Sequence, residues 1–131
     1  STTGYSAALS SKIAETVICI EQDHDLIDFS EKIAIENSMN NIVFIKNEMN
    51  KGYPEQGPYT CILIEGASEE EPSLILEQLA DGGRLVTILN DNEIGSAIKY
   101  SKINGQITNQ FLSSMDAPIL ESFKKSKKFN F

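Results

Sequence analysis

The sequence predicts an α/β fold whose sheet is mostly parallel and ends in an antiparallel hairpin. Short apolar runs rich in β-branched residues alternate with amphipathic segments of helical period, and polar or glycine-containing turns separate them. Near the end, Asn104-Gly105 joins two strand-like segments. With 131 residues, of which 40% are hydrophobic and 23% charged, the chain suits one domain spanning residues 1–131, with helices on both sheet faces.

The first half of the chain contains two helix–strand pairs. Apolar residues at near-helical spacing predict a helix from Tyr5 to Ile13, after a turn of small polar residues. The continuous apolar run Thr16–Glu21 is typical of a parallel strand buried on both faces. A second amphipathic helix is expected from Asp25 to about Asn37, followed by a short buried strand at Ile42–Ile45.

The next two strands flank a third helix. Cys61–Ile64 repeats the design of the earlier strands, after a loop rich in glycine and proline. Pro72 at a first helical turn predicts a helix over Ser73–Leu79, which Asp81-Gly82-Gly83 ends. Arg84–Leu89 is then the following strand.

The last part of the chain changes to an antiparallel design. Ala97–Ile103 and Gln106–Leu112 flank Asn104-Gly105, the strongest two-residue signal for a tight hairpin turn with both residues at positive φ. We find no internal repeat and no low-complexity tract.

Charge and composition restrict the partners and the compartment. A formal net charge of -8 argues against a nucleic-acid partner, because an acidic surface repels phosphate. The lysines near the C-terminus are interpreted as a solvated end rather than a docking patch: Lys124, Lys125, Lys127 and Lys128. No apolar stretch is long enough to cross a bilayer, and Ser1–Gly4 lacks the features of a signal peptide.

The two cysteines give no sign of a disulfide or metal site. Cys19 and Cys61 each lie inside an apolar run, which predicts small buried hydrophobic residues in a reducing compartment. We therefore expect a cytoplasmic protein without a metal.

Candidate ligand-binding residues occur where parallel strands end, which is where α/β sheets bind ligands. Ser1–Ser6 opens a helix with small residues that let the backbone approach a ligand. Glu21 ends a strand, where its carboxylate can accept hydrogen bonds from the hydroxyls of a ribose. Glu48 follows the next strand, where its carboxylate can accept a hydrogen bond from the amino group of adenine. Helix capping and solvated loop acids are the ordinary explanations of the same residues.

Taken together, these features resemble the protein-L-isoaspartate O-methyltransferase family, most closely its bacterial branch. The similarity spans essentially the whole chain and includes the following stretches: Thr3–Ala8, Gly57–Tyr59, Ile62–Ala67, Leu76–Leu79, Gly82–Val86, Asp116–Leu120 and Phe129–Phe131. The resemblance implies a Rossmann-like S-adenosylmethionine-dependent methyltransferase sheet that transfers a methyl group to the carboxyl group of an isoaspartyl residue.

The family resemblance also implies a set of cofactor-binding residues. Those expected to hold S-adenosylmethionine are Thr2, Thr3, Gly4, Tyr5, Glu21, Gln22, Glu48 and Glu65. No catalytic residue is assigned, since a carboxylate that attacks a sulfonium-bound methyl needs positioning and desolvation more than a strong base. Tyr5 either covers the cofactor or packs on the sheet, and His24 is interpreted as a surface residue in the turn after Glu21.

The sequence departs from the family pattern at several points. By the resemblance, this sequence begins inside the glycine-rich motif, so we expect the first, central strand of the family sheet to lie outside it. Thr2 stands at the middle glycine, Thr60 at an acid and Met49 at a frequent glycine. Three hypotheses follow for the missing strand: the Cys19 and Cys61 strands pair directly, another chain completes the sheet as in a homodimer, or residues lie upstream.

Two further functions remain open on sequence grounds. A catalytically inactive binding or assembly module of the same fold is favoured by Thr2 and the absent substrate region. A nicotinamide-dependent oxidoreductase shares the acidic strand end but lacks the full Gly-x-Gly-x-x-Gly fingerprint.

Overall fold

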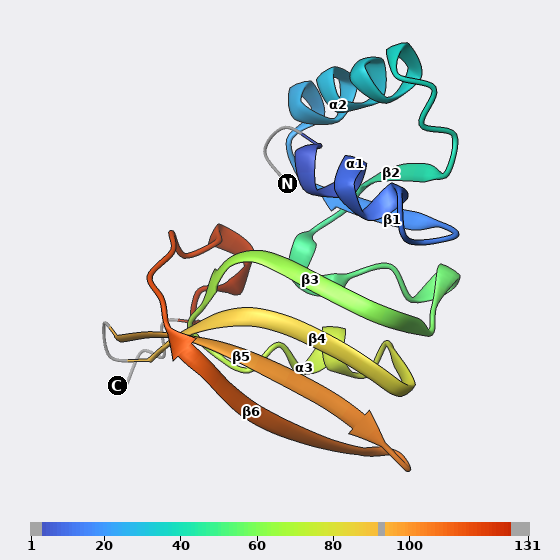
Figure 1. Cartoon of the computed structure of the whole chain (residues 1–131). Helices are drawn as coiled ribbons and strands as arrows, with labels where there is room; N and C mark the ends of the chain where they lie inside the picture. The colour runs from blue at the N-terminus through green and yellow to red at the C-terminus, as the bar shows by residue number, and fades with distance from the viewer. Residues whose placement is uncertain (1–3, 92–93, 127–131) are drawn as a thin grey trace. The chain divides into compact units, whose positions relative to one another are not determined.

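The chain divides into two compact units, residues 1–51 and residues 52–131. The computed structural model describes residues 4–91 and 94–126, and Figure 1 shows the elements of both units. The single-domain assignment of the chain stays a prediction.

The first unit consists of two helices and two parallel strands. Its elements are α1 (Tyr5–Ser11), β1 (Val17–Glu21), α2 (His24–Glu36), β2 (Ile42–Lys46) and the short 3-10 helix η1 (Met49–Lys51). Strands β1 and β2 pair in parallel with Val17 opposite Ile42 and Glu21 opposite Lys46. Each helix contacts both strands. The four main elements therefore lie within a few residues of the predicted boundaries.

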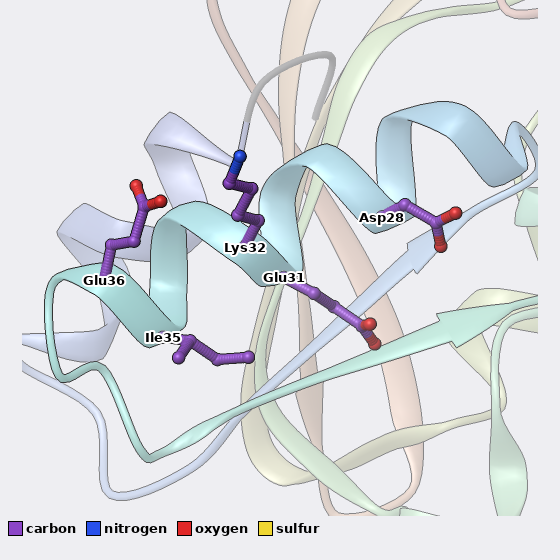
Figure 2. A pocket seen from close by; sticks show the side chains of 5 residues that line it. All are labelled: Asp28, Glu31, Lys32, Ile35 and Glu36. Atoms are coloured by element: carbon purple, nitrogen blue, oxygen red, sulfur yellow. The ribbon is translucent and has the colours of Figure 1, made fainter.

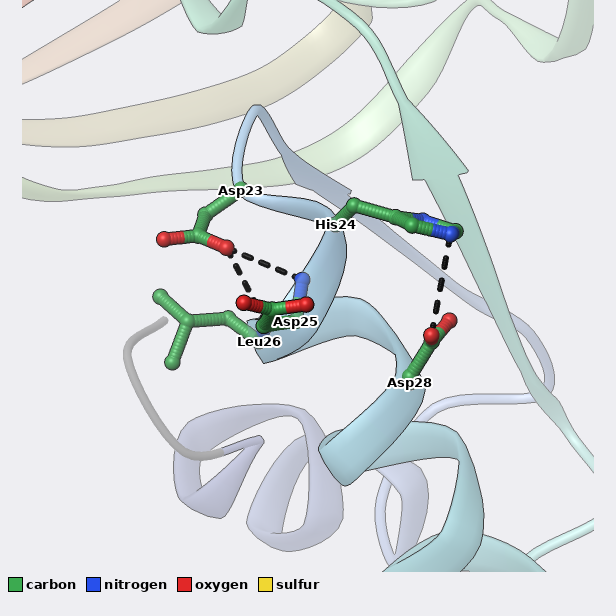
Figure 3. Close-up of polar contacts among 5 residues, drawn as sticks. All are labelled: Asp23, His24, Asp25, Leu26 and Asp28. Carbon is green, nitrogen blue, oxygen red and sulfur yellow. Dashed lines mark hydrogen bonds and ion pairs between the residues drawn. The ribbon is translucent and has the colours of Figure 1, made fainter.

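Helix α2 begins where a side chain caps its first turn. The Asp23 carboxylate accepts hydrogen bonds from the backbone N–H groups of Asp25 at 2.9 Å and Leu26 at 3.4 Å, as Figure 3 shows. Such a cap satisfies donors that the helix itself leaves unpaired. The residues at helical spacing that turn inward are Ile27, Ser30 and Ala34.

The second unit is a four-stranded sheet with the order β3-β4-β5-β6. Its elements are η2 (Pro54–Gln56), β3 (Tyr59–Ser68), α3 (Ser73–Leu76), β4 (Leu79–Asp91), β5 (Ile94–Ile103), β6 (Gln106–Ser114) and η3 (Glu121–Phe123). Strands β3 and β4 pair in parallel, whereas β4–β5 and β5–β6 pair antiparallel. The α/β class, with parallel pairs followed by an antiparallel hairpin, is confirmed.

The hairpin turn has the predicted chemistry. Asn104 and Gly105 both have positive φ, 51° and 76°, as a tight two-residue turn requires. The Asp81 carboxylate accepts a hydrogen bond from the Gly105 N–H at 3.1 Å, which ties the turn to β4.

The predicted helix over Ser73–Leu79 is wrong in its second half. Helix α3 ends at Leu76, and β4 begins at Leu79 and includes Gly82 and Gly83. Tyr59 of β3 lies opposite Leu79 of β4, and Cys61 lies opposite Arg84. Between these two pairs β4 therefore contains more residues than β3, and the ladder is irregular there. A Cβ on Gly83 would lie 2.8 Å from the Ala80 carbonyl oxygen and 2.9 Å from that of Tyr59, so the glycine allows close strand pairing.

The prediction that the first three strands are buried on both faces is also wrong. Val43 in β2 is 44% exposed, Leu63 in β3 is 57% exposed, and Cys61 is exposed rather than buried. In the described residues β1 and β2 form a two-stranded sheet and β3 is an edge strand, so these strands have few neighbours to cover them. Pairing of the Cys19 strand with the Cys61 strand is not among the pairings of the described residues, because β1 pairs with β2 and β3 with β4.

Candidate functional site

Five predicted site residues lie where α1 begins or where β1 and β2 end in the first unit: Gly4, Tyr5, Glu21, Gln22 and Glu48. The start of β1 is fixed to the start of β2, because the Val17 N–H donates to the Asn41 carbonyl at 2.8 Å. The Asn41 side-chain amide also donates to the carbonyls of Ser11 at 2.8 Å and Ala14 at 3.0 Å, which places the end of α1 at this same edge. Helix α1 therefore begins near the carboxyl ends of β1 and β2, as Figure 1 shows.

Gly4 lies at the beginning of α1 in a conformation that favours glycine. Its φ is 70°, and a Cβ there would lie 3.1 Å from both Cβ and Oγ of Ser30 on α2. Ser30 is buried. The α1 backbone consequently approaches α2 more closely than a side chain would allow.

Glu21 is the last residue of β1 and the one buried acidic residue among those that the structure describes. It is 9% exposed, and its Oε1 atom accepts hydrogen bonds from the N–H groups of Gln22 at 2.8 Å and Asp23 at 3.2 Å. The β1–β2 ladder continues past it, since the Asn47 N–H donates to the Glu21 carbonyl at 3.2 Å. These hydrogen bonds hold the Glu21 carboxylate in one orientation. A carboxylate can accept about four hydrogen bonds, so this one can accept others besides those from Gln22 and Asp23.

Gln22 lies in the short turn between Glu21 and the Asp23 cap. Its side chain is exposed. His24 is the first residue of α2 rather than part of the turn, and its Nε2 atom lies 3.6 Å from Oδ2 of Asp28, one helical turn on (Figure 3). Both side chains are exposed, so this contact contributes little to stability.

Glu48 follows β2 in a loop with its own hydrogen bonds. Asn47 Oδ1 accepts from the Glu48 N–H at 2.9 Å, and the Glu48 carboxylate lies 3.0 Å from the Lys51 ammonium. Next to it, Oδ1 of Asn50 is buried and has no hydrogen-bond partner among the described residues. Sequence reasoning missed Asn50, because a loop asparagine gives no pattern and only the coordinates show that its oxygen is buried.

Tyr5 and the remaining predicted site residues are exposed or lie outside the described residues. Tyr5 is 68% exposed, so it does not pack on the sheet. Glu65 is an exposed residue of β3 in the second unit, in the irregular stretch between Leu63 and Ala67. Thr2 and Thr3 lie outside the described residues.

The C-terminal segment of the second unit binds the end of β3. The Ala67 N–H donates to the Pro118 carbonyl at 2.9 Å, and the Leu120 N–H donates to the Ala67 carbonyl at 3.0 Å. A Cβ on Gly66 would lie 2.5 Å from the Leu120 side chain, so the segment lies directly against the strand.

Two of the lysines that follow this segment, Lys124 and Lys125, make contacts within the chain while their side chains stay about half exposed. The Lys125 N–H donates to the Glu69 carboxylate at 2.6 Å, and the Lys125 ammonium lies 3.9 Å from Asp91. Lys124 pairs with Glu121, which raises the pKa of the Lys124 ammonium. Lys127 and Lys128 lie outside the described residues.

A shallow hollow along α2 does not coincide with these residues. Figure 2 shows its lining side chains, which are Asp28, Glu31, Lys32, Ile35 and Glu36. All five are exposed, and none is a predicted cofactor residue. A shallow, exposed surface of this kind does not enclose a ligand as a small-molecule site does.

Residues 4–91 and 94–126 contain neither a metal-binding cluster nor a membrane-spanning helix. No three His, Cys, Asp or Glu side chains lie close enough together to hold a metal ion. No helix of this part of the chain has the length and apolar character needed to cross a bilayer. Neither cysteine forms a disulfide.

Two curated relatives of this chain carry the same description. A protein-L-isoaspartate O-methyltransferase of Methanoculleus marisnigri is 31% identical over 104 residues, which cover 79% of this chain and 47% of that protein. One from Methanospirillum hungatei is 28% identical over 127 residues, covering 96% of this chain and 59% of that protein. The chain thus spans about half the length of the curated relatives it matches.

Solved structures show the same fold. A protein-L-isoaspartate O-methyltransferase matches with a TM-score of 0.86 at 21% identity, over 94% of this chain and 41% of the other. A structure described as a protein-L-isoaspartate O-methyltransferase from Plasmodium falciparum in complex with S-adenosyl-L-homocysteine matches with a TM-score of 0.73 at 22% identity, over 88% and 58%. Residues 1–116 match the family described as Protein-L-isoaspartate(D-aspartate) O-methyltransferase, and the chain therefore belongs to that family.

Proposed function

We propose that the protein containing this chain transfers a methyl group from S-adenosylmethionine to the carboxyl group of an isoaspartyl residue in a protein or peptide. The observation that supports this most is Glu21, a buried carboxylate that two backbone N–H groups hold at the carboxyl end of a parallel strand. Family membership and a related structure described as a complex with S-adenosyl-L-homocysteine support the choice of cofactor.

The described residues fit an adenosyl group at this edge. In this proposal the Glu21 carboxylate accepts hydrogen bonds from the ribose hydroxyls. Gly4 has no Cβ, so the cofactor can approach the backbone at the beginning of α1 closely. At the end of β2, Glu48 and the buried, unpartnered Oδ1 of Asn50 are acceptors suited to the adenine amino group. A buried acceptor without a donor costs about 1–3 kcal/mol, and a bound ligand that donates to it removes that cost.

The chemistry needs little from the protein beyond position. S-adenosylmethionine supplies an electrophilic methyl group on a sulfonium; the substrate carboxylate forms the new C–O bond as the C–S bond breaks, and no proton moves. The residues of this chain therefore bind and orient, and they exclude water from the reacting atoms. Thr2, Thr3, Gly4, Tyr5 and Gln22 remain proposed parts of this cofactor site, and Glu65 stays a cofactor residue that the family resemblance predicts.

Calorimetric titration of the intact protein with S-adenosyl-L-homocysteine tests the cofactor site. Glu21→Gln keeps the size of the side chain but removes its charge, so we expect affinity to fall about tenfold to a hundredfold. Glu31→Gln on the exposed face of α2 is the matched control and should change nothing. Equal affinities for both variants would remove Glu21 from the site.

Methyl transfer to peptides tests the substrate. The intact protein should methylate an isoaspartyl peptide and leave the same peptide with ordinary aspartate unmodified. Cofactor binding without transfer to either peptide would favour the alternative, an inactive binding or assembly module. We also propose a cytoplasmic location, since neither cysteine forms a disulfide.

A homodimer that completes the sheet remains a separate proposal. Among the described residues β1 and β3 are both edge strands, which would leave their edges available to a partner strand. Analytical ultracentrifugation of the intact protein tests this, and a monomer at all concentrations would contradict it.

A further inference from the structure

Strand β6 forms an edge of the second unit, opposite to the β3 edge, and nothing in the described residues covers it. All nine residues from Gln106 to Ser114 are exposed. Figure 1 shows β6 as the last strand of the sheet beyond β5. Its backbone N–H and C=O groups on the outer side are therefore available for pairing with another strand.

This edge lacks the features by which proteins usually prevent strands from associating. Exposed edges commonly carry lysine or other charges, proline, or a bulge in mid-strand. Residues 106–114 contain no charged residue and no proline. The one irregularity in the β5–β6 register lies beyond Phe111, so Gln106–Phe111 is a regular ladder.

The apolar side chains of β6 continue a buried row of the sheet. Ile107 pairs with Lys102, Asn109 with Tyr100 and Phe111 with Ile98, so these three residues of β6 lie on the same face as Tyr100. Tyr100 pairs in turn with Leu85, and both are fully buried. Phe111 is nevertheless 58% exposed and Ile107 38% exposed, which leaves the row incomplete at its outer end.

The strand is complementary to itself in one symmetric antiparallel register. A two-fold axis perpendicular to the sheet keeps each side chain on its own face, so the residue at the axis lies opposite its own copy. With Asn109 at the axis, Ile107 of one chain lies opposite Phe111 of the other, and this apolar pair occurs twice. Cross-strand pairs of an aromatic and a β-branched residue are favourable.

We propose that β6 binds the β6 strand of a second copy of this chain in that register, which joins two four-stranded sheets into one. Self-complementarity favours a second copy over an unrelated partner: in this register each β6 supplies one residue of both Ile107–Phe111 pairs, and no charged residue of one β6 faces the other. The contact is at the opposite edge of the sheet from β3 and does not rest on the proposed enzymatic function.

Sedimentation equilibrium of the intact protein tests the association. Asn109→Lys places two like charges directly opposite each other at the axis, and we expect the dissociation constant of the dimer to rise about tenfold or more. Asn40→Lys, an exposed loop position in the first unit, adds the same charge and should leave the dimer unchanged. A monomer at tens of micromolar, or equal effects of both variants, would overturn the proposal.

Cysteine cross-linking tests the register, in a Cys61→Ser background that removes the exposed thiol. Directly opposed residues of antiparallel strands have Cα atoms about 4.5–5.5 Å apart, within the range of a disulfide, so Asn109→Cys should form a covalent dimer on mild oxidation. Phe111→Cys is the matched control on the same face, because the two copies of residue 111 would lie about 14 Å apart along the strand. Cross-linking of Phe111→Cys to the same extent would overturn the register.

Discussion

The two units of the chain differ in where their side chains are buried. The largest fully buried side chains all belong to the second unit: Leu79, Leu85, Thr87, Tyr100 and Ser68. In the first unit the buried residues are mainly small, and the strand residues of β1 are half-buried apart from Glu21. The second unit has a core of its own, whereas the first unit presents most of the proposed cofactor residues at its strand ends.

The largest expected effect is on the core of the second unit. Leu85→Ala removes a side chain with no exposed surface, so the free energy of unfolding should fall by about 2–5 kcal/mol. Val43→Ala in the first unit removes a side chain that is 44% exposed and should cost less than about 1.5 kcal/mol. Urea unfolding followed by circular dichroism measures both. Similar losses would mean that the two units do not differ in packing.

The elements of the first unit were predictable because local pattern and final structure agree there. Val17–Glu21 is an apolar run whose only long-range requirement is a parallel neighbour, and Asp23 is an ordinary helix cap. The second unit is harder, because Leu79–Gly83 joins β4 through pairing with Tyr59, a residue twenty positions earlier. A glycine pair indicates that a turn or a close approach occurs, and sequence alone does not say which.

The candidate site was predictable in outline only. The position of Glu21 at a strand end follows from the alternation of strands and helices, but its burial and its bonds to Gln22 and Asp23 do not. Burial of the Asn50 oxygen depends on how the loop after β2 folds back, which has no periodic signal. The sequence overestimates how deeply the side chains of β1, β2 and β3 are buried. An apolar run shows that a strand prefers a core, but it does not show how many neighbouring strands and helices cover it.

A comparison of two glycines isolates the role of close approach in the first unit. Gly4 and Gly82 both have positive φ, 70° and 80°, so alanine at either position should cost about 1–2 kcal/mol of stability. Only at Gly4 would the new Cβ also crowd a neighbour, Ser30 at 3.1 Å, because nothing lies within 4 Å at Gly82. Thermal unfolding should therefore show a larger loss for Gly4→Ala, and calorimetry should show weaker binding of S-adenosyl-L-homocysteine for that variant alone. Unchanged binding would separate Gly4 from the cofactor site.

Two buried oxygens without partners offer a smaller and more specific comparison. Oδ1 of Asn50 and Oγ1 of Thr87 both lack hydrogen-bond partners among the described residues. Replacing each by an apolar residue of similar size, Asn50→Leu and Thr87→Val, should raise the free energy of unfolding by about 1 kcal/mol, because an unsatisfied buried polar group is removed. Asn50→Leu should also weaken the binding of S-adenosyl-L-homocysteine, whereas Thr87→Val should not. A loss of stability in Asn50→Leu with full binding would assign the asparagine a purely structural role.

The two units should also differ in how their stability changes at alkaline pH, although no such difference is expected at neutral pH. Burial raises the pKa of Tyr100 from 10.0 to about 12, and the charge of Glu71 and a hydrogen bond to it act in the same direction. The folded chain therefore holds the phenol proton more tightly than the unfolded chain does. This contribution to stability is complete below pH 10 and is lost as the pH rises through 12. Tyr100→Phe should remove much of the fall in unfolding free energy between pH 10 and 12; the part that remains includes Tyr59, whose pKa burial also raises. Both tyrosines belong to the second unit, so alkaline unfolding should begin there, and amide exchange that shows residues 17–46 opening first would contradict the division between the two units.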